Sequence, residues 1–301
     1  MIQFKYPLIA LSGTAASYLF VTGLHEKSPL LVFTGLPVLV FNFANATLTG
    51  FKESMIVQFV TLAFVSYRYY KKSIIFLGIP CGYLMLYVLP TYTTLIREKS
   101  WSGSKTKEIA RQQAYQTFFD DSNDQFIMET NWKFLTNRSS EIGMFVKYVG
   151  KTPKTLGYSG LKIFEDSFLA LVPRAIWPAK PLTETVAMER VYSSGIANRA
   201  SSVSAKTRPV VDGYLMYGAT GVCILMFLYG TITQWIYNKA ETLFSGYEVG
   251  GVVIFNGLFQ QLWRGNNLEF LMNNVLYAYL LMLIIYALAT ISIPLKLPKV
   301  W

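Results

Sequence analysis

The chain has 301 residues, of which 52% are hydrophobic, 16% aromatic and only 15% charged. A soluble domain carries about 25% charged residues, so this chain has too little polar surface to face water on all sides. The composition predicts an integral membrane protein and excludes disordered, fibrous and disulfide-stabilised chains. The net charge of +10 does not indicate a nucleic-acid partner, because Lys and Arg in a membrane protein also set topology and meet lipid phosphates. We therefore expect membrane lipids as partners and no nucleic acid.

Seven apolar runs are long enough, or nearly so, to cross the hydrocarbon core as helices. They are Tyr6 to Leu24, Ser28 to Leu48, Ser54 to Tyr67, Ser73 to Thr93, Val211 to Trp235, Val249 to Trp263 and Leu271 to Ile293. The third and sixth runs are short, which is compatible with re-entrant or tilted segments. The predicted fold is all-α: a polytopic integral membrane protein with about seven transmembrane helices and one large extracytoplasmic loop.

The distribution of Lys and Arg over the short loops predicts the sidedness of the spans. One side collects Lys27, Arg68, Lys71, Lys72, Lys239, Lys296 and Lys299, and the other collects Lys5, Lys52 and Arg264. By the positive-inside rule the first group is cytoplasmic. The chain then divides into four N-terminal spans in residues 1–93, an extracytoplasmic loop in residues 94–210 and three C-terminal spans in residues 211–301. An outside N-terminus with an odd number of helices leads us to expect that the chain is the C-terminal part of a longer protein.

The loop contains the most informative stretch of the chain, Val-Pro-Arg-Ala-Ile-Trp-Pro-Ala-Lys-Pro at residues 172–181. A second, weaker motif, Pro-Val-Val-Asp-Gly-Tyr-Leu-Met-Tyr-Gly, begins at Pro209. Together the two motifs resemble the bacterial O-antigen and oligosaccharide repeat-unit polymerases, over residues 138–230. The resemblance implies a helical fold related to the integral-membrane C-type glycosyltransferases. It also implies metal-independent glycosyl transfer, with no cofactor, on undecaprenyl diphosphate-linked oligosaccharides at the outer face of the bacterial cytoplasmic membrane, with a flippase and a chain-length regulator as partner proteins.

Glycosyl transfer from a diphosphate carrier needs cations to neutralise the leaving group, and the first motif supplies two candidates. Arg174 and Lys180 are separated by Pro-bounded backbone, and a guanidinium grips phosphate oxygens in bidentate fashion where an ammonium acts as a point charge. Trp177 between them is a candidate for stacking on a sugar, although an anchor at the membrane interface explains it as well. Arg138 is a further candidate substrate contact, with snorkelling toward lipid phosphates as the alternative.

A base that takes the proton of the acceptor hydroxyl would assist the reaction. Glu165 or Asp166, which precede Arg174, and Asp212 are candidates for this role. Helix capping or an ion pair with Lys162 explains the first two equally well. Arg208 and Tyr217 flank Asp212 at the outer end of the fifth span and are candidate substrate contacts.

Amides and one arginine gather at the outer ends of the sixth and seventh spans. Amides at this depth are costly unless they line a wet cavity, where they suit sugar hydroxyls, or unless they form interhelical hydrogen bonds. The candidates are Arg264 for catalysis and Gln260, Gln261 and Asn267 for substrate binding. The sequence contains no His or Cys cluster, so we expect no metal site, and no Gly-rich phosphate loop.

Two other function classes remain open from the sequence. A lipid-linked glycan ligase or another polyprenyl-dependent glycosyltransferase differs from a polymerase only in its acceptor, which the sequence does not reveal. A transporter or a non-catalytic assembly component would be favoured by ionisable residues near the bilayer midplane and by internal repeats. The sequence contains neither feature, so we expect a membrane-bound glycosyltransferase that polymerises surface polysaccharide.

Overall fold

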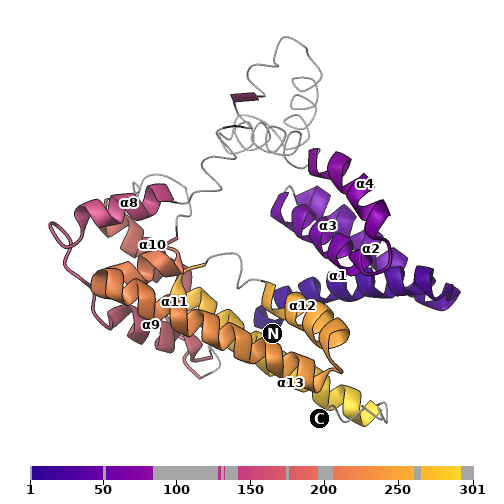
Figure 1. Ribbon diagram of the computed structural model, residues 1–301. Helices are drawn as coiled ribbons and strands as arrows, with labels where there is room; N and C mark the ends of the chain where they lie inside the picture. Colours follow the sequence, from indigo (N-terminus) through magenta and orange to yellow (C-terminus); the bar gives the residue numbers. More distant parts are fainter. Residues whose placement is uncertain are drawn as a thin grey trace. The chain divides into compact units, whose positions relative to one another are not determined.

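The computed structural model describes residues 2–49, 52–83, 128–129, 132, 142–173, 176–195, 206–260 and 266–292. Within these ranges every regular element is a helix, and no strand is present (Figure 1). The longer elements are α1 (Ile2–His25), α2 (Pro29–Thr49), α3 (Lys52–Tyr67), α4 (Lys71–Tyr83), α8 (Ile142–Lys151), α9 (Lys162–Leu171), α10 (Thr183–Ser193), α11 (Pro209–Leu243), the π-helix η3 (Tyr247–Phe255), α12 (Asn256–Phe259) and α13 (Leu268–Ser292). The all-α prediction is confirmed for the described part of the chain.

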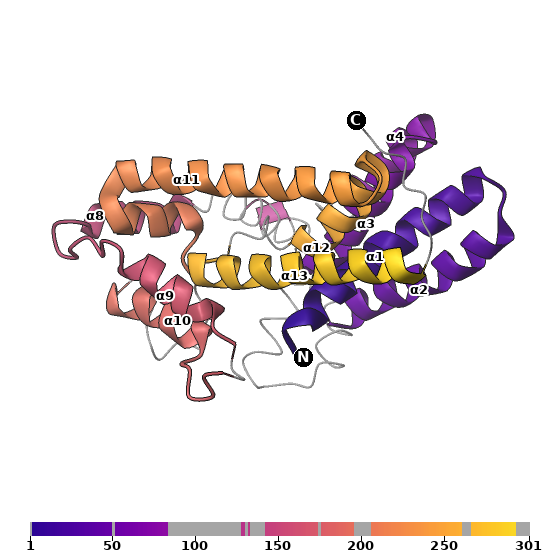
Figure 2. The same cartoon turned by 90° about the horizontal axis from the view of Figure 1, so that it is seen from below.

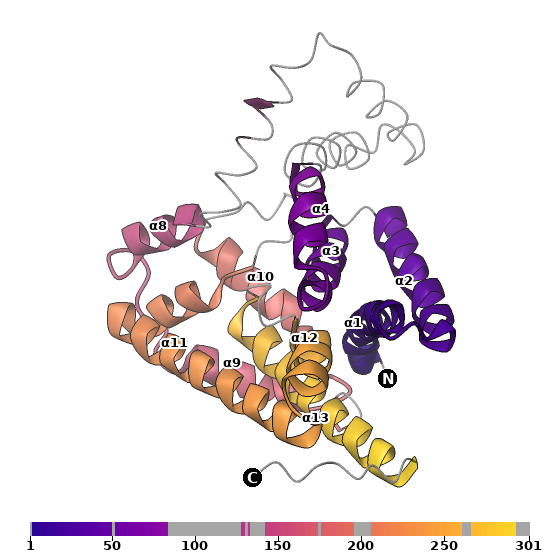
Figure 3. The same ribbon diagram turned by 45° about the vertical axis from the view of Figure 1, so that its right-hand side comes forward.

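The chain forms two compact units. The C-terminal unit contains Met1–Ser12 together with Ile142–Trp301, and the N-terminal unit contains Gly13–Glu141. In the C-terminal unit α11 and α13 lie side by side, with α8, α9 and α10 gathered around the end at which α13 begins (Figure 2). In the N-terminal unit α2 packs against α3, and α3 against α4 (Figure 3).

The core of the C-terminal unit is apolar and aromatic. Tyr148, Phe259 and Met282 are completely buried, and they come from α8, α12 and α13. The amphipathic helix α9 packs along α13 through Ile163 and Ala170. The buried residues of the loop helices therefore share one core with the helices of the apolar C-terminal segment.

Helix α11 consists of two helical segments that meet at Tyr217 and Gly218. Gly218 has φ 63° and ψ −144°, a backbone region that only glycine populates without strain. The two segments approach so closely that a Cβ on Gly221 would lie 2.1 Å from the carbonyl oxygen of Gly213. The predicted span Val211 to Trp235 therefore contains a break, and its first turns form a separate short segment.

Three described helices are long and apolar enough to cross a membrane: Pro7–His25, Pro209–Leu243 and Leu268–Ile291. They correspond to the first, fifth and seventh predicted spans. The second, third and sixth predicted spans fall on shorter apolar helices, Pro29–Asn45, Val57–Tyr67 and Tyr247–Phe259. The fourth extends beyond Tyr83, outside the described residues.

The long helices of the C-terminal unit carry large apolar side chains on the faces that the unit leaves uncovered. Phe227 on α11 is 73% exposed, and Ile291 on α13 is 79% exposed. Such surfaces are rare on soluble proteins and are the normal outer surface of membrane-embedded helices. The structure is therefore compatible with a membrane protein.

Candidate functional site

A buried ion cluster joins the loop helices to the apolar helices of the C-terminal unit. Nη1 of Arg190 lies 3.0 Å from Oδ1 of Asp212, and Nη2 donates to Oε1 of Glu269. The two carboxylates are 0% and 1% exposed, and the arginine side chain is 15% exposed. One guanidinium therefore pairs with two carboxylates in a region with almost no access to water.

The positions of the two acids follow from helix geometry. Asp212 lies in the first turn of α11 and Glu269 in the first turn of α13, where unpaired backbone N–H groups and the helix dipole favour negative charge. The backbone N–H of Leu268 donates to Oδ2 of Asp212 at 2.8 Å, so the first acid also binds the beginning of α13. Arg190 comes from the last turn of α10.

Two buried polar side chains complete the cluster. Nη1 of Arg190 also reaches Oγ1 of Thr207 at 3.5 Å, and Nδ2 of Asn267 donates to Oε2 of Glu269 at 2.5 Å. Both Thr207 and Asn267 are fully buried. These contacts fix the orientation of the guanidinium and of the second carboxylate.

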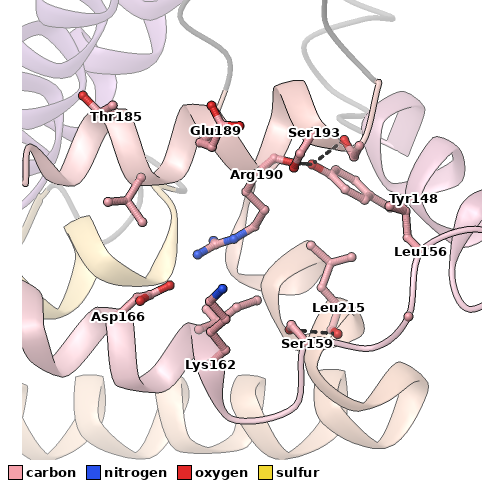
Figure 4. Close-up of a pocket in the computed structure, with 14 residues that line it drawn as sticks. Tyr148, Leu156, Ser159, Lys162, Asp166, Thr185, Glu189, Arg190, Ser193 and Leu215 are labelled. Atoms are coloured by element: carbon pink, nitrogen blue, oxygen red, sulfur yellow. Dashed lines mark hydrogen bonds between the residues drawn. The ribbon is translucent and has the colours of Figure 1, made fainter.

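A cavity of about 510 Å³ lies beside the cluster and has the size of a small-ligand pocket. Its walls come from α8, α9, α10, the loop that follows α8 and the first segment of α11. Figure 4 shows the side chains of Lys162, Asp166 and Arg190 pointing toward one another from α9 and α10. Among the described residues, no hydrogen bond or ion pair occupies the Lys162 ammonium or the Asp166 carboxylate. The cavity thus presents a cation and an anion next to each other on one wall.

The surroundings shift the proton affinities of the groups that line this cavity. Burial raises the pKa of the Asp166 carboxyl, with the charge of Arg190 opposing the shift and that of Glu269 adding to it. Burial opposes the charged form of Arg190, but the charges of Asp212 and Glu269 outweigh burial and raise the pKa of the guanidinium. Burial also raises the pKa of the Tyr148 phenol, which keeps its proton at neutral pH. The Asp166 carboxylate is therefore more basic than an ordinary aspartate, and it lies beside a permanent cation.

A second, smaller cavity of about 80 Å³ also adjoins Asp166. Trp177, Lys180 and Glu269 contribute to its lining. Asp166 and Val186 border both cavities. Asp166 therefore contributes to the lining of two neighbouring cavities.

A family model described as a domain of unknown function, DUF8712, matches residues 1–296. The chain belongs to the DUF8712 family. No curated protein and no solved structure matches it. In the described part of this DUF8712 chain, no group of three or more His, Cys, Asp or Glu side chains could hold a metal ion.

The structure of this DUF8712 chain brings some of the predicted site residues into the cluster or next to it. Asp212 and Asn267 are members of the cluster. Trp177 and Lys180 line the smaller cavity. The Lys180 ammonium donates to the carbonyl oxygens of Ala170 at 2.5 Å and Val172 at 2.9 Å, so it also closes the loop after α9.

Other predicted residues of the DUF8712 chain lie away from both cavities. Glu165 is exposed on α9, and Tyr217 is 50% exposed at the break in α11. Arg208 is half-buried and precedes α11, where its carbonyl oxygen accepts the Asp212 N–H at 2.9 Å. Gln260 is half-buried directly after α12. The predicted residues Arg138, Arg174, Gln261 and Arg264 lie outside the described residues.

Sequence reasoning missed three charged members of this DUF8712 site, Lys162, Arg190 and Glu269. Lys162 was considered only as an ion-pair partner of Glu165 or Asp166. One signal pointed to a missing cation: Asp212 and Glu269 each begin an apolar helix, and a carboxylate buried there requires a partner. Nothing in the sequence indicates that Arg190 is that partner.

Proposed function

We propose that this protein polymerises surface polysaccharide by transferring a glycan from a polyprenyl diphosphate carrier to the end of a second lipid-linked oligosaccharide. The observation that carries the proposal is the 510 Å³ cavity, in which the Lys162 ammonium faces the Asp166 carboxylate beside Arg190. A diphosphate requires fixed positive charge, and an acceptor hydroxyl benefits from a base. The cavity offers both chemical groups within one wall.

In the proposed step, the Lys162 ammonium binds diphosphate oxygens beside Arg190, which also lines the cavity. The bond between the anomeric carbon and the diphosphate oxygen breaks, and its electron pair leaves on the polyprenyl diphosphate. The acceptor oxygen forms the new bond to the anomeric carbon, and its proton passes to the Asp166 carboxylate. The raised pKa of Asp166 favours this transfer, because a more basic carboxylate accepts a proton more readily.

The surroundings of the cavity suit a lipid-linked substrate. The cavity lies at the end where α13 begins, and the uncovered faces of α11 and α13 are apolar. A polyprenyl chain can lie along such faces while its diphosphate reaches Lys162 on the cavity wall. The two motifs that resemble repeat-unit polymerases supply the loop after α9 and the first segment of α11, both of which adjoin the site. We place the site on the extracytoplasmic side of the bacterial cytoplasmic membrane, in agreement with the distribution of basic residues over the short loops.

The proposal is tested by deleting the gene and separating the surface polysaccharide by size. We expect the deletion to leave single repeat units and to remove long chains. Wild-type protein and Lys154→Ala, an exposed lysine in the turn after α8, should restore the long chains, whereas Lys162→Ala at equal membrane abundance should not. Unchanged long chains in the deletion strain would reject the proposal. Loss of the single repeat units from the surface polysaccharide, together with the long chains, would indicate a ligase. This result would also reject polymerisation.

A further inference from the structure

A basic and aromatic patch lies at one end of the N-terminal unit, where the turns α1–α2 and α3–α4 come together. The His25 ring stacks on the Tyr69 ring with 4.2 Å between their centroids, and this contact joins the two turns. The patch is made of the following side chains: His25, Lys27, Tyr67, Arg68, Tyr69, Tyr70, Lys71 and Lys72. All four Lys and Arg residues of the patch are exposed.

The aromatic rings hold two of these cations in place. The guanidinium carbon of Arg68 lies 5.8 Å from the centroid of Tyr69, and Nζ of Lys71 lies 5.6 Å from the centroid of Tyr67. Cation–π contact limits the rotamers of long side chains, so less entropy is lost when they bind an anion. Glu26 is the acidic residue in these turns, so the patch carries a clear excess of positive charge.

Exposed apolar side chains begin directly next to the basic residues. Leu30 and Phe33 follow Lys27 on α2 and are 72% and 76% exposed, and Ile75 and Phe76 follow Lys72 on α4 and are 62% and 78% exposed. The patch also lies at the end of the candidate span Pro7–His25. Membrane proteins place exposed apolar, aromatic and basic side chains in this spatial order at the boundary between acyl chains and headgroups.

We infer that this patch is a binding site for the phosphate headgroups of anionic phospholipids. Arg68, Lys71 and Lys72 provide the charge, the tyrosines lie at headgroup depth, and the adjoining apolar side chains contact the acyl chains. The shared chemistry is a phosphate monoanion, which a free phosphate could also supply. The apolar surroundings assign the site to a lipid. The inference does not depend on the proposed glycosyl transfer.

The test measures affinity for dioctanoyl-phosphatidylglycerol by thermal-shift titration of the full chain in a non-ionic detergent. Each basic residue near a lipid surface contributes about fivefold in affinity, so the triple variant Arg68→Gln, Lys71→Gln, Lys72→Gln should bind roughly a hundredfold more weakly. A matched triple variant, Lys5→Gln, Lys147→Gln, Lys154→Gln, removes the same charge from exposed positions elsewhere and should bind as the wild type does. Melting temperatures without added lipid show that both variants are folded.

Two sets of control titrations distinguish the anionic lipid from other ligands. Inorganic phosphate and water-soluble glycerol 3-phosphate at equal concentration should give a much smaller shift, and phosphatidylcholine of the same chain length should give little. Equal affinity of the two triple variants would overturn the inference. A shift from free phosphate as large as that from the anionic lipid would also overturn it, because the ligand would then be a soluble phosphate.

Discussion

Arg190 and Asp212 form a buried ion pair, with 3.0 Å between Nη1 and Oδ1, although they are 22 positions apart and belong to different helices. The same guanidinium binds Glu269 at the start of α13. Three helices therefore meet at a single cation, and the wall of the neighbouring cavity depends on it. Buried ion pairs contribute little net stability when complete, but removing one partner leaves uncompensated charge.

We predict that Arg190→Ala lowers the free energy of unfolding by about 3–5 kcal/mol, because two carboxylates would remain buried without a cation. The melting temperature in detergent measures this effect. The triple variant Arg190→Met, Asp212→Asn, Glu269→Gln should recover much of the loss, because it leaves no buried charge. A wild-type melting temperature for Arg190→Ala, or no recovery in the triple variant, would show that the buried carboxylates do not need Arg190 for stability.

Lys162→Ala should reduce the rate of glycan transfer on the order of a hundredfold, because a preorganised contact to the leaving diphosphate is lost. Its melting temperature should change little, since the Lys162 side chain is exposed and has no hydrogen bond among the described residues. Lys154→Ala is the matched control and should retain the wild-type rate. Equal rates for the two variants would show that Lys162 does not bind the leaving group.

Asp166→Asn should lower the transfer rate by about a hundredfold or more, the usual contribution of a general base. The pKa of Asp166 lies above its ordinary value near 3.8. As the pH is lowered, the wild-type rate should therefore begin to fall at a higher pH than it would with an unperturbed carboxyl. Asp166→Asn should lack this acid limb. Glu165→Gln, one residue away and exposed, should lose less activity, and the reverse order would assign the base to Glu165.

The same raised pKa has a consequence for stability. A carboxyl whose folded-state pKa is raised favours the folded state at pH values below its unfolded pKa, and this contribution is lost as the pH rises through the folded pKa. At neutral pH the ionised Asp166 therefore costs stability, and Asp166→Asn should melt at a higher temperature than the wild type. The difference should disappear in acid. A lower melting temperature at neutral pH would indicate that Asp166 serves the fold as an ion-pair partner.

Gly218→Ala should destabilise the protein by about 1–3 kcal/mol, because the backbone region at φ 63° excludes a Cβ. The added methyl carbon would also lie only 3.0 Å from the Tyr158 hydroxyl oxygen. Gly230→Ala is a matched control on the same helix, where nothing lies within 4 Å of the new carbon. The control should stabilise the helix by up to about 1 kcal/mol. The melting temperatures of both variants should be measured by thermal unfolding. A shift in the same direction for both would contradict the helix break at Tyr217 and Gly218.

The sequence predicted the features that depend on local composition. Long apolar runs indicated the three helices that could cross a membrane, because hydropathy over some 20 residues is a local property. The break in α11 escaped prediction, because a glycine within an apolar run is common in helices that pack closely, and only its φ angle reveals the turn.

The site was only partly predictable for the same reason. Asp212 and Asn267 were named from their place beside apolar helices, but their contacts join segments that are far apart in the chain. The partner Arg190 is 79 positions from Glu269. Lys180 was expected at a phosphate, and its spacing from Arg174 could not show that the loop would bring two carbonyl oxygens to its ammonium.

We propose that the cavity wall of Lys162, Asp166 and Arg190 performs glycosyl transfer from a polyprenyl diphosphate. The most direct measurement incubates the purified full chain with a lipid-linked oligosaccharide and a metal chelator and separates the products by size. We predict a ladder of longer glycans with release of polyprenyl diphosphate, and its loss in folded Lys162→Ala and Asp166→Asn but not in Lys154→Ala. A folded wild-type protein that does not elongate the oligosaccharide, or that strictly requires a divalent metal or a nucleotide sugar, would contradict the proposed glycosyl transfer.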